Sequence, residues 1–214
     1  MAIAVEHVAG ADAGTVAIVP AGSDRLLLTF HASDDAGDTA IPLVATFKTT
    51  EIVTEVQRSA SANGQASAVG RLIAPTTGSG TLAGNYAATA GMALSGVDQT
   101  TPISGLEMTE ANAASLTLGI ASGVGDLVVG SFCVNNGSPP FITASGDSPT
   151  VRLEQAVASG GTGLAIVTCP GAAGDVNIGG SWSSARATQI AFNVEVAAAA
   201  LEARASRLPL LGVQ

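Results

Sequence analysis

The sequence predicts an all-β protein with two antiparallel sheets packed face to face as a β-sandwich. The clearest signal lies between residues 85 and 104, where apolar side chains alternate along an extended run before a turn. Alternation of this kind is typical of a strand with one buried face, because successive side chains of a strand point to opposite sides. Turn-forming residues recur at short intervals, and no long run of helix formers occurs before residue 197. This spacing favours a Greek-key or jelly-roll sandwich over an α/β sheet.

The strands are predicted from β-branched and aliphatic runs that end at glycine, proline or aspartate. In the central stretch, Gly96 ends the apolar run, and Asp98 and Pro102 then favour a compact turn that leads off the sheet. Asn63-Gly64 predicts a hairpin. Residues 106–115 are expected to form a helical turn or an irregular crossing. The predicted strands are 2–9, 15–19, 25–32, 42–48, 50–58, 66–74, 81–97, 116–120, 126–134, 150–158, 163–168, 176–182 and 186–196.

We expect one sandwich domain over residues 1–196, followed by a C-terminal segment of different character. Residues 197–207 consist of strong helix formers, and 208–214 form an apolar tail whose proline ends the helix. An exposed apolar terminus is costly unless something covers it. The segment is interpreted either as an arm that docks onto a neighbouring subunit or as a frayed end or strap on its own sandwich. The candidate partner-binding residues of the arm are Leu201, Leu208, Pro209, Leu210, Leu211 and Val213.

A short internal similarity joins two distant parts of the sequence. Asp24 is followed six residues later by Phe30, and Asp126 is followed in the same way by Phe132. The match would fit two related halves of one sandwich. A turn followed by a strand produces such matches easily, so we interpret it as coincidence.

Composition predicts a charge-poor surface that suits permanent assembly. Hydrophobic residues make up 47% of the 214-residue chain, which is ample for a core, but aromatic residues make up only 3%. Charged residues account for 12%, about half the share usual in soluble domains, and Lys48 is the only lysine. The surface must therefore be built mainly from Ser, Thr, Gly and Ala. Because mixed charges normally keep free monomers apart, we expect a homo-oligomer or a component of a larger assembly.

Charge and hydropathy argue against two classes of partner. The formal net charge of −9 and the scattered arginines do not provide the basic patch that nucleic-acid binding requires. No apolar run reaches the roughly 18 residues of a membrane helix, and the N-terminal sequence lacks the basic start of a secretory signal. We therefore expect neither nucleic acid nor membrane as a partner, and no secretion.

Nucleophilic and metal chemistry find little support in the sequence. A catalytic triad needs a histidine beside a serine and a carboxylate, but His7 and His31 are the only histidines and no Gly-x-Ser-x-Gly motif occurs. Cys133 and Cys169 lack CxxC spacing and are interpreted as two buried thiols, with a disulfide between them as the alternative. We expect no enzymatic activity and no cofactor.

Three further groups of polar or aromatic residues are candidate sites. The loop aspartates 34, 35 and 38 could supply oxygen ligands to Ca²⁺, but their spacing does not match an EF-hand. Glu51 and Glu55 would share one face of a strand, where the surrounding Thr and Val residues indicate solvent rather than a hydrolytic cleft. Trp182 and Tyr86 are the candidate glycan-contacting residues of a carbohydrate-binding alternative.

Several segments resemble a family of jelly-roll, lectin-like β-sandwich proteins that occur in tailed-bacteriophage structural modules and bacterial surface proteins. The resemblance spans roughly residues 14–194, and its most specific part is Ser95 to Ile103. The chain differs from the family pattern in having Arg71-Leu72-Ile73 where an aromatic residue is usual, and in its added C-terminal segment. The segments that carry the resemblance are 22–28, 71–78, 93–103, 125–129, Trp182 and 191–192.

The resemblance implies a non-enzymatic bacteriophage virion protein that is assembled in the host cytoplasm. Its expected partners are capsid or head-fibre subunits, and its expected role is that of a capsid decoration or head-fibre component. A tail- or baseplate-associated virion protein and a carbohydrate-binding adhesion module remain as alternatives.

Overall fold

The computed structural model describes residues 2–12, 14–34, 42–60, 65–135, 139, 142–156, 161–183 and 186–197. In this part of the chain all regular secondary structure is β, and every ladder is antiparallel, which confirms the predicted all-β class. The strands are β1 (Ala4–Asp12), β2 (Thr15–Ile18), β3 (Leu26–Asp34), β4 (Ala45–Phe47), β5 (Glu51–Ile52), β6 (Thr54–Ala60), β7 (Gln65–Ile73), β8 (Gly80–Gly84), β9 (Ala88–Ser95), β10 (Ile103–Ala111), β11 (Ser115–Ser122), β12 (Leu127–Val134), β13 (Thr143–Gly146), β14 (Thr150–Ala156), β15 (Gly163–Pro170), β16 (Gly174–Ser181) and β17 (Ala187–Val194).

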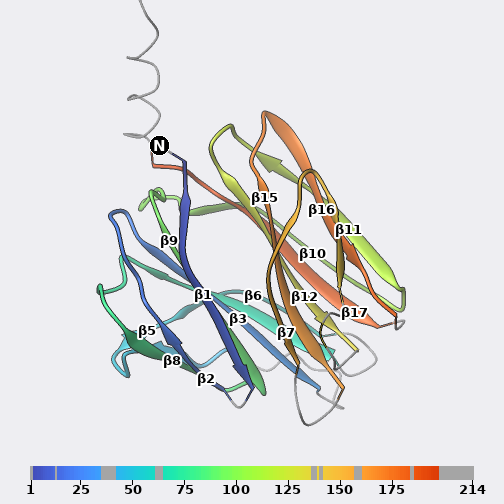
Figure 1. Ribbon diagram of the computed structural model, residues 1–214, viewed down its shortest axis with the longest axis horizontal. Helices are drawn as coiled ribbons and strands as arrows, with labels where there is room; N and C mark the ends of the chain where they lie inside the picture. The colour runs from blue at the N-terminus through green and yellow to red at the C-terminus, as the bar shows by residue number, and fades with distance from the viewer. Residues whose placement is uncertain are drawn as a thin grey trace, which may run out of the picture.

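The described strands form four sheets that stack as four layers (Figure 1). The first inner sheet has the order β1-β9-β3-β7-β6, and the second inner sheet has the order β10-β17-β12-β15-β14. The first outer sheet, β2-β8-β4-β5, covers the far side of the first inner sheet. The second outer sheet, β11-β16-β13, covers the far side of the second inner sheet. The sequence predicted two facing sheets, whereas the described strands form four layers.

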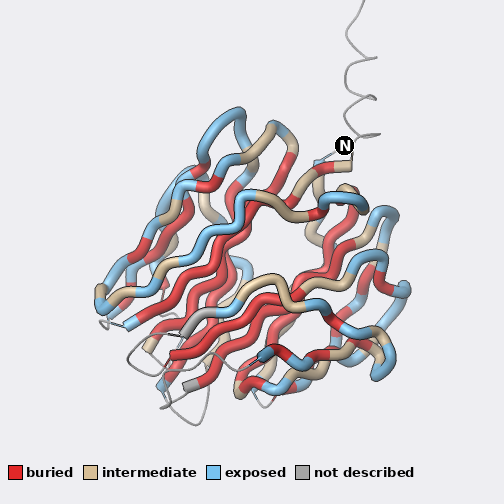
Figure 2. The backbone as a smooth tube through the Cα atoms, turned by 180° about the vertical axis from the view of Figure 1, so that it is seen from behind, coloured by how far each residue is buried: buried red, intermediate tan, exposed pale blue. Residues whose placement is uncertain are grey.

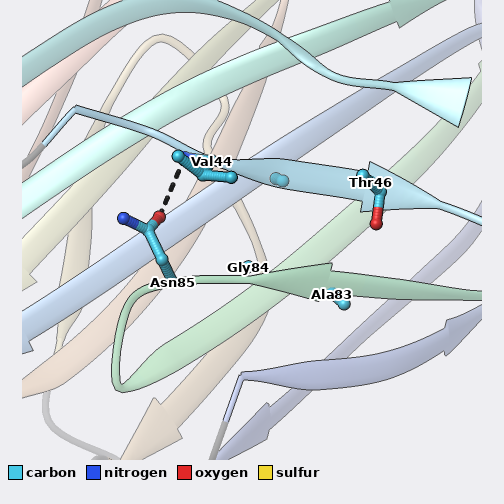
Figure 3. Close-up of a pocket in the computed structure, with 6 residues that line it drawn as sticks. Val44, Thr46, Ala83, Gly84 and Asn85 are labelled. Carbon is cyan, nitrogen blue, oxygen red and sulfur yellow. Dashed lines mark hydrogen bonds between the residues drawn. The ribbon is translucent and has the colours of Figure 1, made fainter. Parts of the chain in front are cut away.

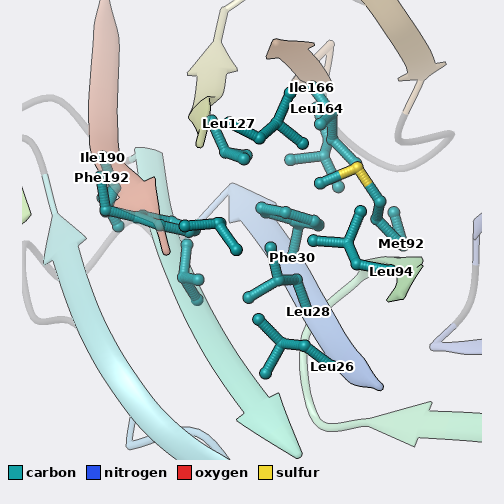
Figure 4. Packing of buried hydrophobic residues seen from close by; sticks show 14 of the residues in the cluster. Leu26, Leu28, Phe30, Met92, Leu94, Leu127, Leu164, Ile166, Ile190 and Phe192 are labelled. Carbon is teal, nitrogen blue, oxygen red and sulfur yellow. The ribbon is translucent and has the colours of Figure 1, made fainter. Parts of the chain in front are cut away.

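Three apolar cores separate the four layers, and burial is deepest in the inner sheets (Figure 2). The central core lies between the inner sheets, where Leu28, Phe30, Leu127 and Phe192 converge (Figure 4). Each inner sheet also packs against its own outer sheet. The central strands of the inner sheets, such as β9, β12 and β17, thus bury both of their faces, which consumes much of the chain's large supply of Val, Leu, Ile and Ala.

Strand β9 shows how the four layers alter the burial predicted for the stretch between residues 85 and 104. The sequence predicts a strand with one buried face, but all eight residues of β9 are buried. Ala90, Met92 and Leu94 face the central core, whereas Ala93 faces the core of the first outer sheet. The second face is built from small residues, and Gly91 leaves room for Ile18 of β2. The prediction of a half-exposed strand was wrong because small side chains on the second face also lie against a packed layer.

The second half of the chain repeats the strand order of the first half. Replacing β1, β9, β3, β7 and β6 by β10, β17, β12, β15 and β14 converts the first inner sheet into the second. The outer sheets correspond in the same way, with β2, β8 and β4 matched by β11, β16 and β13. Only the short strand β5 has no counterpart among the described residues. We call β1–β9 the first half and β10–β17 the second half.

The repeat extends to individual hydrogen bonds. The Glu55 carboxylate accepts a bond from the Leu43 backbone N–H at 2.6 Å, and Glu154 accepts one from Ile142 at 2.8 Å. Glu55 of β6 thus holds the residue that leads into β4, and Glu154 of β14 holds the residue that leads into β13. The donors Leu43 and Ile142 occupy matching places, but the glutamates do not, because Glu55 pairs with Gly70 and Glu154 pairs with Ala165, two residues before the match of Gly70. The two halves therefore hold matching residues by the same kind of bond from different points of β6 and β14.

One hydrogen bond is repeated with its two residue types exchanged. In the first half, Ser95 at the end of β9 donates to Glu6 of β1. In the second half, Ser104 of β10 donates to Glu195 just after β17. Glu6 follows Val5, which pairs with Leu94, and Ser104 follows Ile103, which pairs with Val194. Ser95 and Glu195 in turn follow Leu94 and Val194. A bond preserved with swapped partners is a signal that a search for identical residues cannot find.

The similarity between Asp24–Phe30 and Asp126–Phe132 is out of step with this structural repeat by one residue. Ladder registers match Leu26 with Leu127, so Phe30 corresponds to Ser131. Phe30 accordingly faces the central core, whereas Phe132 faces the second outer sheet. The match of letters is coincidental, as expected, although the chain does contain two related halves.

The turn predicted after β9 joins the two halves. Gly96 adopts a φ of 72°, which favours glycine, and the Asp98 carboxylate accepts the N–H groups of Thr100 and Thr101 at 2.7 and 2.8 Å. These two donors, that of Thr101 foremost, lower the pKa of the Asp98 carboxyl. Val97 pairs with Val196, so the ends of both halves lie side by side.

Several predicted elements differ from the observed ones. Residues 106–111 belong to the edge strand β10 and form neither a helical turn nor an irregular crossing, because the ladder with β17 supplies their backbone partners. The single strand predicted over 81–97 is two strands, β8 in an outer sheet and β9 in an inner sheet. Strand β13 was not predicted. From residue 198 onward the predicted helix and tail lie outside the described residues.

Candidate interaction surfaces

The described histidines do not meet a serine and a carboxylate. His31 is fully buried on β3, and its Nδ1 lies 3.2 Å from the hydroxyl of Thr89. Burial lowers the pKa of His31 to about 3, so the imidazole is neutral near pH 7. Its Nε2 has no hydrogen-bond partner among the described residues. His7 is half-buried on β1, the edge strand of the same inner sheet.

The two cysteines are free thiols in separate cores, as the interpretation of buried thiols predicted. Cys133 lies in the central core and donates to the Ala66 carbonyl at 3.6 Å, whereas Cys169 lies in the core of the second outer sheet. Burial, with a further contribution from Asp147, raises the pKa of the Cys169 thiol to about 11. A disulfide between the two cysteines is excluded by this arrangement.

Tyr86 and Trp182 occupy corresponding places in the two halves, each just after the strand that lies second in its outer sheet. Tyr86 is 4% exposed and its ring lies 5.9 Å from that of His31. Trp182 is 7% exposed and its ring lies 6.3 Å from that of Phe132. Both rings therefore pack inside separate cores, and the structure does not bring them together as a sugar platform.

The predicted acidic groups do not converge either. Glu51 and Glu55 lie in different sheets, because the chain crosses from the first outer sheet to the first inner sheet at Val53. Glu51 accepts bonds from Thr76, and Glu55 holds the Leu43 backbone. The prediction that they share a face was wrong for this reason. Of the aspartates at 34, 35 and 38, the last two lie outside the described residues, and no group of metal-ligating side chains occurs in the described part.

In the described part of the chain, the outward side chains of the first outer sheet are all uncharged. Neighbouring ladders align Thr15, Ala83, Thr46 and Ile52 as one row across its four strands. Val44 extends the same face and is 68% exposed, while Ile52 is 75% exposed. We call this surface the first outer face. Its outward side chains are Thr15, Ala17, Val44, Thr46, Ile52, Thr81 and Ala83.

A shallow depression of about 210 Å³ lies on the first outer face between β4 and β8 (Figure 3). Asn85 closes its end, because its amide accepts the Val44 N–H at 3.0 Å and donates to the Pro42 carbonyl at 3.0 Å. Val44, Thr46 and Ala83 line the depression. The two bonds fix the backbone that leads into β4, so the aliphatic side chain of Val44 is held outward on a rigid edge.

The second outer face has different chemistry on the same framework. Its row Thr117, Gly179 and Ser145 consists of small or hydroxyl-bearing residues. Ladder registers and the repeat match Val44 with Thr143 and Thr46 with Ser145. The described strands of this sheet carry no exposed large aliphatic side chain. The two halves therefore share a fold and differ in what they show to solvent.

The six candidate residues of the C-terminal arm lie outside the described residues. Among the residues that the structure describes, no helix is long and apolar enough to span a membrane. Comparison with family models, with curated proteins and with solved structures finds no match to this chain.

Proposed function

We propose that this protein is a non-enzymatic structural component of a bacteriophage virion, a capsid decoration or head-fibre protein that self-associates and binds neighbouring shell subunits. The observation that carries the proposal is the first outer face, a rigid sheet surface free of charged side chains on a chain of net charge −9. A surface of this kind suits contact with another protein, because little charge has to be desolvated on binding.

The same proposal includes a jelly-roll topology for each half. Two features support it: the inner-sheet order β1-β9-β3-β7, and the outer-sheet order β2-β8-β4 completed by β5. In this arrangement β5 and β6 act as one bent strand that passes from the outer to the inner sheet at Val53. Sandwiches of this topology serve as rigid modules in viral shells and lectins, so topology alone does not select between those roles.

The positions of the reactive side chains also favour a role through surfaces. His31, Cys133 and Cys169 lie inside cores, where they contribute to packing. The rings of Tyr86 and Trp182 lie inside cores as well, so the structure gives the carbohydrate-binding alternative no exposed aromatic platform from this pair. Within the described residues, the outer sheets and their rims remain available to a partner.

Co-sedimentation with purified phage particles tests the proposal. The full chain and a variant that ends at Ala197 are compared, because the Ala197 N–H still donates to Gly96 and should be retained. We expect the full chain to pellet with particles and the truncated chain to pellet less, because residues 198–214 are proposed as a second contact beside the first outer face. Undiminished pelleting of the truncated chain would count against docking through residues 198–214.

Electron microscopy of labelled particles then locates the protein. Density on the head supports the decoration or head-fibre role, whereas density on the tail or baseplate replaces it with the tail-associated alternative. Absence of the full chain from purified particles would contradict the virion role altogether.

A further inference from the structure

Because the two halves share the same strand order, comparing their outer sheets shows which features the fold itself requires of an outer sheet. Both outer sheets cover an inner sheet, and both bury the same alternate residues, such as Leu82 in β8 and Ile178 in β16. Their outward residues face no described layer, so the fold leaves them free to vary. A difference between the outward residues of the two halves therefore reports on something other than folding.

The outward residues of the two outer sheets differ in one direction, because the first half carries the large aliphatic side chains. Val44 of the first half corresponds to Thr143 of the second half, and Ile52 has no counterpart among the described residues. Exposed aliphatic side chains cost solubility and add nothing to the core beneath them. The first half also adds β5, the strand without a counterpart, and Ile52 is its outward residue. Two exposed aliphatic residues and an added strand thus enlarge one outer face only.

We propose that the first outer face is a self-association surface, on which a second copy of this chain packs sheet to sheet across a two-fold axis. A two-fold interface places each residue against the same patch of the partner, so like charges would meet within it. Among the described residues, the first outer face carries no charged outward side chain, on a chain with 17 acidic and 8 basic residues. It is therefore a surface on which two copies can meet without repulsion.

The molecule already uses this mode of packing internally. The first and second inner sheets pack through the central core, with corresponding residues such as Met92 and Phe192 on opposite sides. The antiparallel pairing of Val97 with Val196, and the bond from the Ala197 N–H to Gly96, join the ends of the two halves. A second copy on the first outer face would extend the stack by the same kind of contact.

Size sets the expected strength of the contact. Four strands about 4.8 Å apart and about five residues long give a face of roughly 300 Å². A standard protein interface buries about 800 Å² per partner, so the isolated pair is expected to be weak. Association becomes extensive where copies are concentrated side by side, and in that respect the inference rests on the proposed virion role.

Sedimentation equilibrium on the full chain tests the inference with a matched pair of variants. Val44→Asp places a carboxylate in the proposed contact, and Thr143→Asp places one at the corresponding position of the second half. Both positions are exposed, so the two variants change net charge equally with little effect on the core. We expect at least about tenfold weaker self-association for Val44→Asp and little change for Thr143→Asp. Equal weakening by both, or a wild-type chain that remains monomeric at about 1 mM, would overturn the inference.

A second measurement reads the geometry directly. Thr46→Cys places a thiol on the row that crosses the first outer face, and Ser145→Cys is its counterpart in the second half. Under mild oxidation we expect disulfide-linked dimers from Thr46→Cys only. Preferential dimers from Ser145→Cys would contradict the assignment. Self-association that Val44→Asp weakens, without any pelleting of the wild type with particles, would refute the virion role and leave this surface intact.

Discussion

His31 connects the chemistry of one side chain to the stability of the first half. It lies on β3 with Thr29 and Ser33, and all three point toward the first outer sheet, where each has a polar atom without a described partner. The corresponding residues of β12 are Gly130, Phe132 and Val134. The same strand position therefore tolerates an apolar core, and the polar residues of β3 carry a cost of burial.

We expect this cost to appear as acid sensitivity. The pKa of His31 is about 3 in the folded protein, against an ordinary value of 6.5 for an exposed histidine, so the unfolded chain binds the proton first as the pH falls. Stability from this group is complete above pH 6.5 and is lost as the pH falls toward 3, with a loss of about 2 kcal/mol by pH 5. Urea unfolding between pH 7 and pH 4 measures it. His31→Phe, which copies the residue at position 132 of the second half, should lack this component, and parallel profiles for the two proteins would contradict the assignment.

The buried thiols give a second prediction at this scale. The thiolate is the reactive form of cysteine, and burial raises the pKa of Cys169 to about 11. Cys133 is fully buried in the central core. We expect both cysteines to resist alkylation in the native protein at pH 8 and to react rapidly in denaturant. Labelling of either cysteine in the folded state at the rate of a free thiol would show that its core opens locally.

Among the elements, the two glutamate bonds that hold the matching residues Leu43 and Ile142 can be tested as a pair. Glu55→Ala and Glu154→Ala each remove the acceptor of a part-buried backbone N–H. We expect each substitution to lower the free energy of unfolding by about 1–3 kcal/mol, with a smaller loss for Gln, which retains an acceptor oxygen. Chemical denaturation measures both. If only one of the two substitutions lowered the free energy of unfolding, the two bonds would not contribute equally to stability.

The sequence predicted most strands but not their assignment to layers. Alternation located the strand that contains Met92, because a period of two is visible in the chain itself. It could not show that the other face of β9 is also buried, since Ala and Gly occur equally on exposed surfaces. The jelly-roll expectation came from turn spacing. The repeat of the strand order in two halves was not predicted, because it is visible in the ladder registers and leaves no run of identical residues in the sequence. Of the candidate sites, the first outer face was missed because Val44 and Ile52 resemble ordinary strand residues.

At the scale of the whole molecule, the central core makes each half depend on the other. Among the described residues, the inner faces of the two inner sheets are buried against one another, so neither half covers its own central-core residues when alone. A buried hydrogen bond of 2.8 Å between Ser67 and Thr188 also crosses this boundary. The protein is therefore expected to unfold as one unit, although it contains two sandwiches.

Calorimetry and hydrogen exchange test this dependence. We expect a single transition in which the calorimetric and van 't Hoff enthalpies agree. Phe192→Ala should cost about 3–5 kcal/mol, because it opens a cavity in the central core, and should speed amide exchange in both halves. Ile178→Ala, in the core of the second outer sheet, is the control whose local effect should centre on the second half. Two resolved transitions, or faster exchange after Phe192→Ala in the second half alone, would mean that the halves are stable separately and that the central core only tethers them.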